Sequence, residues 1–379
     1  MRIKKRKRKM EWWDILFLLD NNKMVKDRIL ITGGTGLVGH GIRAVSHYNY
    51  SSSDTEFIFI SSRDYDLTNA EDVQRMFEEH RPNKIIHLAA CVGGLFKNMS
   101  QKVDMLEKNL IMNFNIVRGA HDFGVKRLIA CLSTCVFPNH VPSYPITEEM
   151  LHEGPPHSSN DAYAYAKRML EVHCRAYRET FGDDFICVSP TNIYGPHDNF
   201  DLEEGHVLPS LIHKCRLAKQ AGKPFVVRGS GTPLRQFIYS QDVGALILRL
   251  LELETCPPHV ILSVPESHEV SIRHAGELIA REMDYENALT FDASYSDGQH
   301  KKTVSSTKIM ELFPDFQFTS LEEGLTQTIR WFNDHYNSDA RIGNLPEETA
   351  EISPEHSATT MPRTSSFWKQ WTQWMTGNR

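Results

Sequence analysis

Short apolar runs alternate with longer amphipathic stretches along the first half of the chain. The runs are rich in β-branched and aromatic residues, as in buried parallel strands. They fall at residues 28–32, 56–61, 84–88, 127–133 and 185–189. Helical periodicity marks the stretches between them, at residues 37–46, 70–80, 103–123 and 161–180. This alternation predicts an α/β fold of the Rossmann type, a doubly wound parallel sheet with helices on both faces.

The pattern changes near residue 205, where the elements become shorter and more mixed. We therefore expect a nucleotide-binding domain at residues 27–204 and, at residues 205–336, mainly a smaller α/β substrate-binding domain. Residues 337–379 are rich in Glu, Ser, Thr and Pro and predict a disordered tail. Seven of the first nine residues are basic. Residues 1–26 predict a disordered extension, or an upstream start that precedes a working start at Met24.

Composition excludes several classes of protein. The 379 residues carry a net charge of −6, so any phosphate site is local and we predict no nucleic-acid partner. No apolar run reaches the roughly 18 residues of a membrane helix, so we predict no membrane span. The seven cysteines show no paired metal-ligand spacing. They predict reduced thiols, no metal and a cytoplasmic location.

A glycine-rich turn follows the first predicted strand and opens the first predicted helix. Its glycines give the pattern G-x-x-G-x-x-G. In this context the first glycine permits a tight turn, the second a close approach to a pyrophosphate, and the third tight packing of helix on strand. The helix N-terminus offers free N–H groups to the anion. The dinucleotide-binding residues predicted here are Gly33, Gly34, Thr35, Gly36, Leu37, Val38 and Gly39.

The end of the second predicted strand bears on the choice of cofactor. An acidic residue there binds the ribose hydroxyls of NAD, whereas an arginine binds the extra phosphate of NADP. Both are present, as Arg63 and Asp64. Arg63 comes first and its guanidinium can form a fork to phosphate. We therefore predict NADP.

Tyr163 and Lys167 stand four residues apart on one helical face. A lysine ammonium near a phenol favours the phenolate, so we expect Lys167 to lower the pKa of Tyr163. The pair follows Ser133, which ends the fourth predicted strand at the edge where such sheets bind ligands. The chain thus contains, in order, the glycine turn, the strand-end serine and the Y-x-x-x-K pair. With this combination it resembles the extended short-chain dehydrogenase/reductase family over residues 27–336.

Four further segments resemble the GDP-L-fucose synthase family within that group. They are residues 92–96 (VGGLF), 133–138 (STCVFP), 190–200 (PTNIYGPHDNF) and 205–209 (GHVLP). The resemblance implies an NADPH-dependent enzyme that epimerises GDP-4-keto-6-deoxy-D-mannose at C3 and C5 and then reduces C4. It also implies a homodimer paired through the long helices beside the sheet.

The resemblance assigns roles that suit this chemistry. Cys135 and His206 match the acid/base pair of the epimerisation, and a thiol and an imidazole both titrate close enough to neutrality for proton exchange. Ser133 and Tyr163 would hydrogen-bond the C4 oxygen and stabilise an enolate. Tyr163 would then protonate that oxygen during hydride transfer, while Lys167 holds the nicotinamide ribose.

Further positions match the family's binding residues. Those facing the cofactor are Leu88, Ala89, Ala90, Pro190, Thr191, Asn192, Ile193 and His206. Those facing the GDP-sugar are Lys214, Arg228, Arg235 and Asp297. Lys214 and Arg235 suit a pyrophosphate. Arg228 departs from the family, in which tryptophan is usual, and could replace the aromatic contact by stacking or by binding phosphate.

Two alternatives remain open on the sequence. One is another nucleotide-sugar enzyme of this fold, such as a 4-epimerase or a 4,6-dehydratase. A 4-epimerase would need no Cys135/His206 pair, and a dehydratase would usually carry acidic residues beside the serine. The other is a non-catalytic NADP-binding regulator, against which the intact Ser133, Tyr163 and Lys167 argue.

Overall fold

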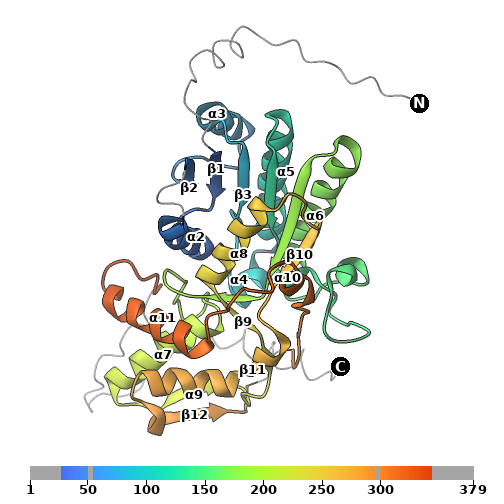
Figure 1. The fold of residues 1–379 in the computed structure, drawn as a ribbon. Helices are drawn as coiled ribbons and strands as arrows, with labels where there is room; N and C mark the ends of the chain where they lie inside the picture. Colours follow the sequence, from blue (N-terminus) through green and yellow to red (C-terminus); the bar gives the residue numbers. More distant parts are fainter. Residues whose placement is uncertain (1–26, 50–53, 296, 298, 344–379) are drawn as a thin grey trace, which may run out of the picture. The chain divides into compact units, whose positions relative to one another are not determined.

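The computed structural model describes residues 27–49, 54–295, 297 and 299–343. Its centre is a six-stranded sheet in the order β10-β5-β4-β3-β1-β2, in which every neighbouring pair is parallel (Figure 1). The strands are β1 (Asp27–Thr32), β2 (Thr55–Ile60), β3 (Lys84–His87), β4 (Arg127–Cys131), β5 (Asp184–Pro190) and β10 (His259–Leu262). The predicted Rossmann-type α/β fold is confirmed.

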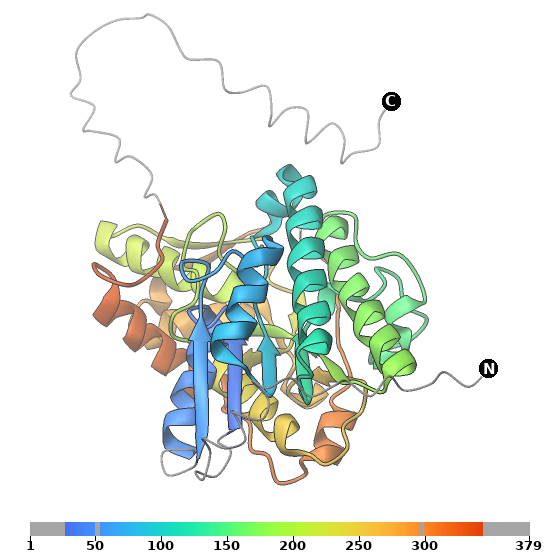
Figure 2. The ribbon, with the colours of Figure 1, turned by 90° about the horizontal axis from the view of Figure 1, so that it is seen from above.

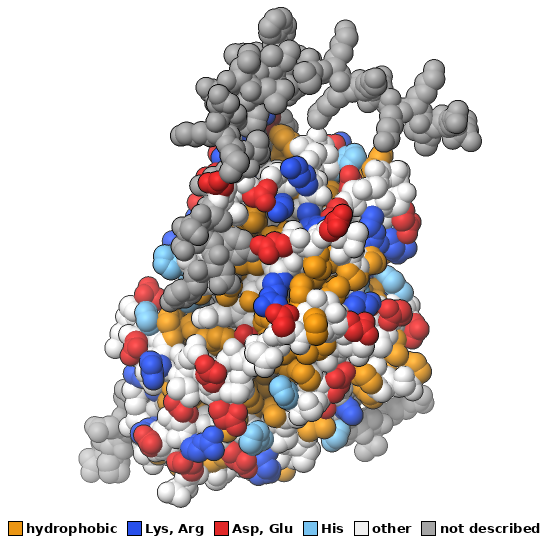
Figure 3. All heavy atoms as spheres, viewed as in Figure 1, with side chains coloured by type: hydrophobic (Ala, Val, Ile, Leu, Met, Phe, Trp, Pro, Cys, Tyr) orange, Lys and Arg blue, Asp and Glu red, His pale blue; other side chains and the backbone are white. Residues whose placement is uncertain are grey.

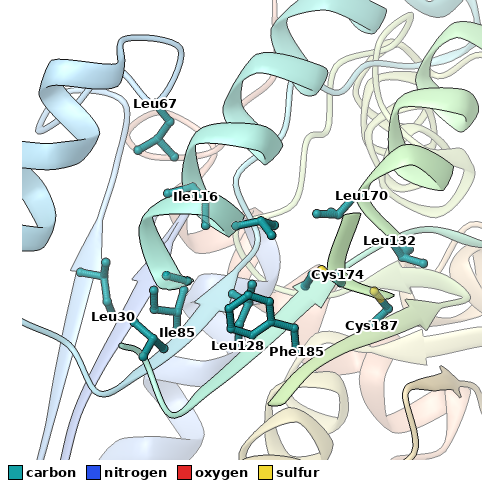
Figure 4. Packing of buried hydrophobic residues seen from close by; sticks show 14 of the residues in the cluster. Leu30, Leu67, Ile85, Ile116, Leu128, Leu132, Leu170, Cys174, Phe185 and Cys187 are labelled. Carbon is teal, nitrogen blue, oxygen red and sulfur yellow. The ribbon is translucent and has the colours of Figure 1, made fainter. Parts of the chain in front are cut away.

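Helices cover both faces of this sheet. One face carries α3 (Ala70–His80), α5 (Lys102–Asp122) and α6 (Asp161–Phe181), which lie side by side in Figure 2. The other carries α2 (Leu37–Asn49), α8 (Ser240–Glu252) and α10 (Thr307–Leu312). Figure 4 shows the first layer, where Leu30, Ile85 and Leu128 of the strands pack with Ile116 and Leu170 of the helices. Strands enclosed on both faces explain the continuous apolar runs in the sequence.

A second group of elements surrounds a separate hydrophobic cluster. Its helices are α7 (Val207–Ala221), α9 (Ile272–Glu282) and α11 (Leu321–His335). Three two-stranded sheets accompany them, namely β7 (Phe225–Arg228) with β12 (Leu289–Asp292), β6 (Asn192–Tyr194) with β9 (Phe237–Tyr239), and β8 (Leu234–Arg235) with β11 (Val270–Ser271). Short elements complete the fold: α4 (Leu95–Ser100), η1 (Thr134–Val136), η2 (Glu148–His152), η3 (Glu266–His268) and η4 (Glu286–Ala288).

The chain crosses between these two groups more than once. Strand β10 adds the sixth strand to the main sheet beside β5, and α8 packs against α2. Both come from beyond residue 204, where we expected mainly the substrate domain. The described chain also continues past residue 336, because Arg341 forms a bridge with Asn199. Residues 1–26 and the tail from residue 344 lie outside the described residues.

The order of the strands creates a topological switch point at one edge of the sheet. The chain moves from β1 outward to β2 on one side and then to β3 on the other, so the connections diverge between β1 and β3. Parallel sheets bind ligands outside the carboxyl ends of their strands at such a point. The glycine turn follows β1, and Leu88 to Ala90 follow β3, so the fold places both at this edge.

The molecular surface carries mixed charge on the face that Figure 3 displays. Where grey atoms do not cover it, acidic and basic side chains are interspersed with hydrophobic ones. No helix in the described part of the chain is both long enough and apolar enough to cross a membrane.

Candidate active site

The glycine turn has the geometry that a dinucleotide requires. Gly33 has φ 69°, which favours glycine, and a Cβ there would lie 2.8 Å from the backbone nitrogen of Ala89. At Gly39 a Cβ would lie 2.6 Å from the backbone of Gly34, so this residue permits the helix to start directly against the turn. Two predicted cofactor segments, the turn and Leu88–Ala89, are thus in contact.

At the end of β2, the side chain of Arg63 is available to a ligand, whereas that of Asp64 is not. Asp64 accepts hydrogen bonds from the Ser61 backbone N–H at 2.7 Å and the Ser61 hydroxyl at 2.8 Å. These bonds, from the hydroxyl first, lower the pKa of Asp64. Arg63 is exposed, and its backbone N–H donates to the Ser61 hydroxyl at 3.2 Å. The carboxylate that would bind the ribose hydroxyls of NAD therefore stabilises the turn, and this arrangement fits NADP.

Ser133 and Cys135 form one short structure at the end of β4. Ser133 precedes the 3-10 helix η1, and its hydroxyl accepts from the Cys135 backbone N–H at 3.4 Å. Cys135 is buried, whereas Ser133 is half-buried. The serine thus caps the turn that holds the cysteine.

Tyr163 and Lys167 lie on α6 beside this turn. The Lys167 ammonium donates to the Cys131 carbonyl at 2.7 Å and lies 5.9 Å from the centroid of the Tyr163 ring. Burial raises the pKa of Tyr163 well above its usual range and lowers that of Lys167. Our expectation of a lowered tyrosine pKa is therefore wrong. Desolvation and the charges of nearby cysteines, Cys135 first, raise this pKa, while the lysine ammonium donates to a carbonyl and not to the phenol.

Lys302 is a charged neighbour of Cys135 that the sequence did not reveal. Burial raises the pKa of the Cys135 thiol, while the ammonium of Lys302, the Ser133 hydroxyl and the ammonium of Lys167 act against this rise. Burial in turn lowers the pKa of Lys302. The adjacent Lys301–Lys302 pair resembles ordinary surface charge in the sequence, so no pattern marks it.

The segment from β5 to α7 carries the remaining predicted cofactor residues and His206. Thr191 donates its backbone N–H to the Leu262 carbonyl at 3.0 Å, and the Asn192 amide donates to the Gln236 carbonyl at 2.9 Å. His206 is exposed at the N-terminal cap of α7. His206 therefore lies on a different element from the Ser133 turn. In the described part of the chain no hydrogen bond joins its side chain to Cys135 or Tyr163.

The four predicted substrate residues lie in the second group of elements. Lys214 is on α7, and burial together with the charge of Arg228 lowers its pKa. The Arg228 guanidinium carbon lies 4.7 Å from the centroid of the Tyr295 ring, so this departure from the family is paired with an aromatic side chain.

The other two flank the same region. Burial lowers the pKa of Arg235, whose guanidinium donates to the Leu234 carbonyl at 2.7 Å. Asp297 accepts from the Ser230 backbone N–H at 2.9 Å and from the Ser230 hydroxyl at 2.6 Å. Arg235 is also a charged neighbour of Lys302, which links these residues to Cys135.

Comparison with known proteins agrees with this arrangement. Residues 29–262 match the model of the NAD dependent epimerase/dehydratase family. The chain belongs to this family. Among its members, the GDP-L-fucose synthase of Dictyostelium discoideum is 45% identical over 314 residues, which cover 83% of this chain and 97% of the relative. The GDP-L-fucose synthase of Escherichia coli is 32% identical, with 82% and 97% covered.

A solved structure of the same family has a similar fold. It is the GDP-L-fucose synthetase of Naegleria fowleri bound to NADP, with a TM-score of 0.80 and 46% identity. The match covers 84% of this chain and 96% of that chain. The resemblance to the GDP-L-fucose synthases that the motifs predicted is confirmed, and with it the extended short-chain dehydrogenase/reductase architecture.

Proposed function

We propose that this chain is a GDP-L-fucose synthase, which uses NADPH to convert GDP-4-keto-6-deoxy-D-mannose to GDP-L-fucose. One observation carries the proposal: a buried thiol, Cys135, shares its surroundings with Ser133, Tyr163 and Lys167. A plain reductase of this fold needs only the last three. The added thiol supplies a proton-exchanging group, as epimerisation requires. The relatives named GDP-L-fucose synthase in two distant organisms support the same conclusion.

Epimerisation begins because the C4 ketone makes the protons on C3 and C5 acidic. One group removes such a proton, which leaves an enolate, and another returns a proton on the opposite face. We assign these roles to Cys135 and His206. The Ser133 hydroxyl and the Tyr163 phenol stabilise the charge on the C4 oxygen. Burial favours the protonated Cys135 thiol and so suits it to donate a proton, while Lys302 stabilises the thiolate that results.

Reduction follows at C4. NADPH, when bound, supplies the hydride. The raised pKa of Tyr163 keeps its phenol protonated, so this residue is a proton donor to the C4 oxygen. The Lys167 ammonium, held on the Cys131 carbonyl, offers its remaining N–H bonds to the nicotinamide ribose.

The GDP portion requires positive charge and a planar contact. Lys214 and Arg235 are cations whose burial disfavours their charged forms. A bound diphosphate stabilises those charged forms. Arg228 and Tyr295 together provide a flat surface next to Lys214. We assign that surface to the base.

The decisive experiment supplies the protein with NADPH and GDP-4-keto-6-deoxy-D-mannose. We expect oxidation of NADPH and formation of GDP-L-fucose, identified by chromatography and NMR. Without oxidation of NADPH, the proposal fails. A reduced product with unchanged configuration at C3 and C5 would show that the protein is a reductase without epimerase activity.

The two half-reactions separate in the variant Cys135→Ser. A hydroxyl is a far weaker acid than a thiol, so we expect deuterium uptake from D₂O at C3 and C5 to fall by about 10²-fold or more. NADPH affinity should not change, because Cys135 is not among the predicted cofactor-binding residues. Cys215→Ser, a buried thiol on α7, is the matched control. Equal deuterium uptake in both variants contradicts the role of Cys135.

We also propose that the protein forms a homodimer through α5 and α6. Ile111, Phe114 and Met169 project from these helices, and the last two are 49% and 50% exposed. Such exposed apolar side chains on packed neighbouring helices are typical of interfaces. The variant Phe114→Asp should shift sedimentation from dimer toward monomer, and an unchanged dimer would exclude this face. The seven free thiols support a reducing compartment, so we propose the cytoplasm as its location.

A further inference from the structure

Asp198 is a buried carboxylate that the chemistry described above does not use. It lies in the connection between β6 and α7, and is 3% exposed. Its Oδ1 accepts from the Asn199 backbone N–H at 2.7 Å, and its own N–H donates to the Gly195 carbonyl at 3.3 Å. Its Oδ2 is buried and has no hydrogen-bond partner within residues 27–343 as described.

An unsatisfied buried carboxylate oxygen is costly, since a charge removed from water needs a partner. Two charged groups interact electrostatically with Asp198. One is His206 at the start of α7, and the other is Arg341 near the end of the described chain. Arg341 is engaged elsewhere, because its guanidinium donates to the His197 carbonyl at 2.8 Å and its backbone pairs with Asn199. His206 is therefore the group with which Asp198 can interact during the reaction.

His206 needs such a neighbour. Its side chain makes no capping hydrogen bond although it stands at the N-terminus of α7. Other carboxylates of the same segment are less suited. Asp201 accepts the backbone N–H groups of Glu203 and Glu204, and both glutamates are exposed.

We propose that Asp198 is a positioning residue that orients the His206 imidazole and balances the charge which this imidazole acquires from the sugar proton. The inference rests on the proposed function. In the step, the C–H bond of the sugar breaks, its electron pair forms the enolate, and the proton moves to the imidazole. Asp198 remains a carboxylate throughout. The pairing of a histidine with a buried carboxylate is a general means of fixing its orientation.

The charge state of Asp198 adds a pH dependence. Burial raises the pKa of Asp198 from its usual value to about 6, while the charges of His206 and Arg341 act in the opposite direction. The carboxylate is therefore present above pH 6 and is lost as the pH falls through that value. Epimerisation should decline over the same interval.

The test compares wild type with Asp198→Asn between pH 5.5 and 8, with NADPH and the keto sugar in D₂O. Asparagine keeps the acceptor for the Asn199 N–H and removes the charge. At pH 7.5 we expect deuterium uptake to fall by about tenfold or more, and the acidic limb to lose the part that protonation of Asp198 contributes near pH 6. Asp201→Asn is the matched control, expected to stay within about twofold of wild type. Uptake and limb both unchanged in Asp198→Asn overturn the inference.

A second variant decides the matter if Asp198→Asn does not fold. In Arg341→Gln the cation that opposes protonation of Asp198 is gone, so the acidic limb should move to higher pH. A limb that stays in place overturns the inference. The proposed function fails separately: wild type would then neither take up deuterium nor oxidise NADPH, whereas a failure of this inference alone leaves both activities intact.

Discussion

Replacing Arg63 by alanine tests whether the end of β2 selects the cofactor. Asp64 is held by the Ser61 N–H and hydroxyl, so Arg63 is the side chain of this turn that remains for a phosphate. We expect Arg63→Ala to weaken NADPH binding and to leave NADH binding unchanged. The reason is that NADH has no phosphate on the adenosine ribose for a guanidinium to bind.

The magnitude follows from the exposure of Arg63. A hydrogen bond to a charged group contributes roughly 1.5–3 kcal/mol, and an exposed site lies at the lower end because water competes. A loss of about 1–2 kcal/mol corresponds to a dissociation constant for NADPH about 5- to 30-fold higher. Because the contact is ionic, the loss should shrink as the salt concentration rises.

The assay is a fluorescence titration of NADPH and of NADH at fixed ionic strength. Arg281→Ala is the matched control, since it removes an exposed arginine from α9 and changes the net charge equally. Two results refute the reasoning. One is a loss of NADPH affinity below about twofold, too small for a phosphate contact; the other is an equal loss for NADH, which would show that Arg63 stabilises the turn and does not select the cofactor.

Two further predictions concern groups that the sequence did not single out. Lys302→Met removes a cation that opposes the rise in the pKa of Cys135, so the pH dependence of deuterium uptake should move to higher pH. The expected shift is about one pH unit for each 1.4 kcal/mol of lost interaction. An unchanged pH profile would contradict this prediction. Gly41→Ala should cost about 1–3 kcal/mol in urea unfolding, because its Cβ would lie 2.3 Å from the Ser240 carbonyl oxygen of α8. Gly276→Ala on α9 is the control, since the nearest atom is 3.5 Å away and no loss is expected there.

Periodicity was sufficient to predict the first five strands and the long helices between them, but not the short helix α4. The predicted helix at residues 161–180 is α6 (Asp161–Phe181), and the predicted strand at residues 84–88 is β3 (Lys84–His87). Strand β10 was missed because it lies among short, mixed elements and its partner β5 is about 70 residues away in sequence. Such a long-range pairing depends on the tertiary structure at the edge of the sheet, and the local composition does not indicate it.

The residues of the site likewise fall into those that the sequence indicates and those that it does not. The glycine turn acts through its own segment and could be placed from spacing, whereas the role of Cys135 beside Ser133 came from the family resemblance. Residues that act through distant neighbours could not be placed from spacing. Lys302 approaches Cys135, and Arg341 approaches Asp198, only because the fold returns the C-terminal part of the chain to the sheet edge. The sign of the Tyr163 pKa shift was missed for the same reason, since burial is a property of the whole fold.

Ionisable groups around the site share one tendency. Burial raises the pKa of the acids Tyr163 and Cys135, and lowers that of the bases Lys167, Lys214 and Lys302. Burial thus displaces each group toward its neutral form. In the proposed reaction a diphosphate and an enolate would reverse this for the bases, because each negative charge stabilises an ammonium in a region of low dielectric. The cations would then stabilise the enolate more strongly than they could in water.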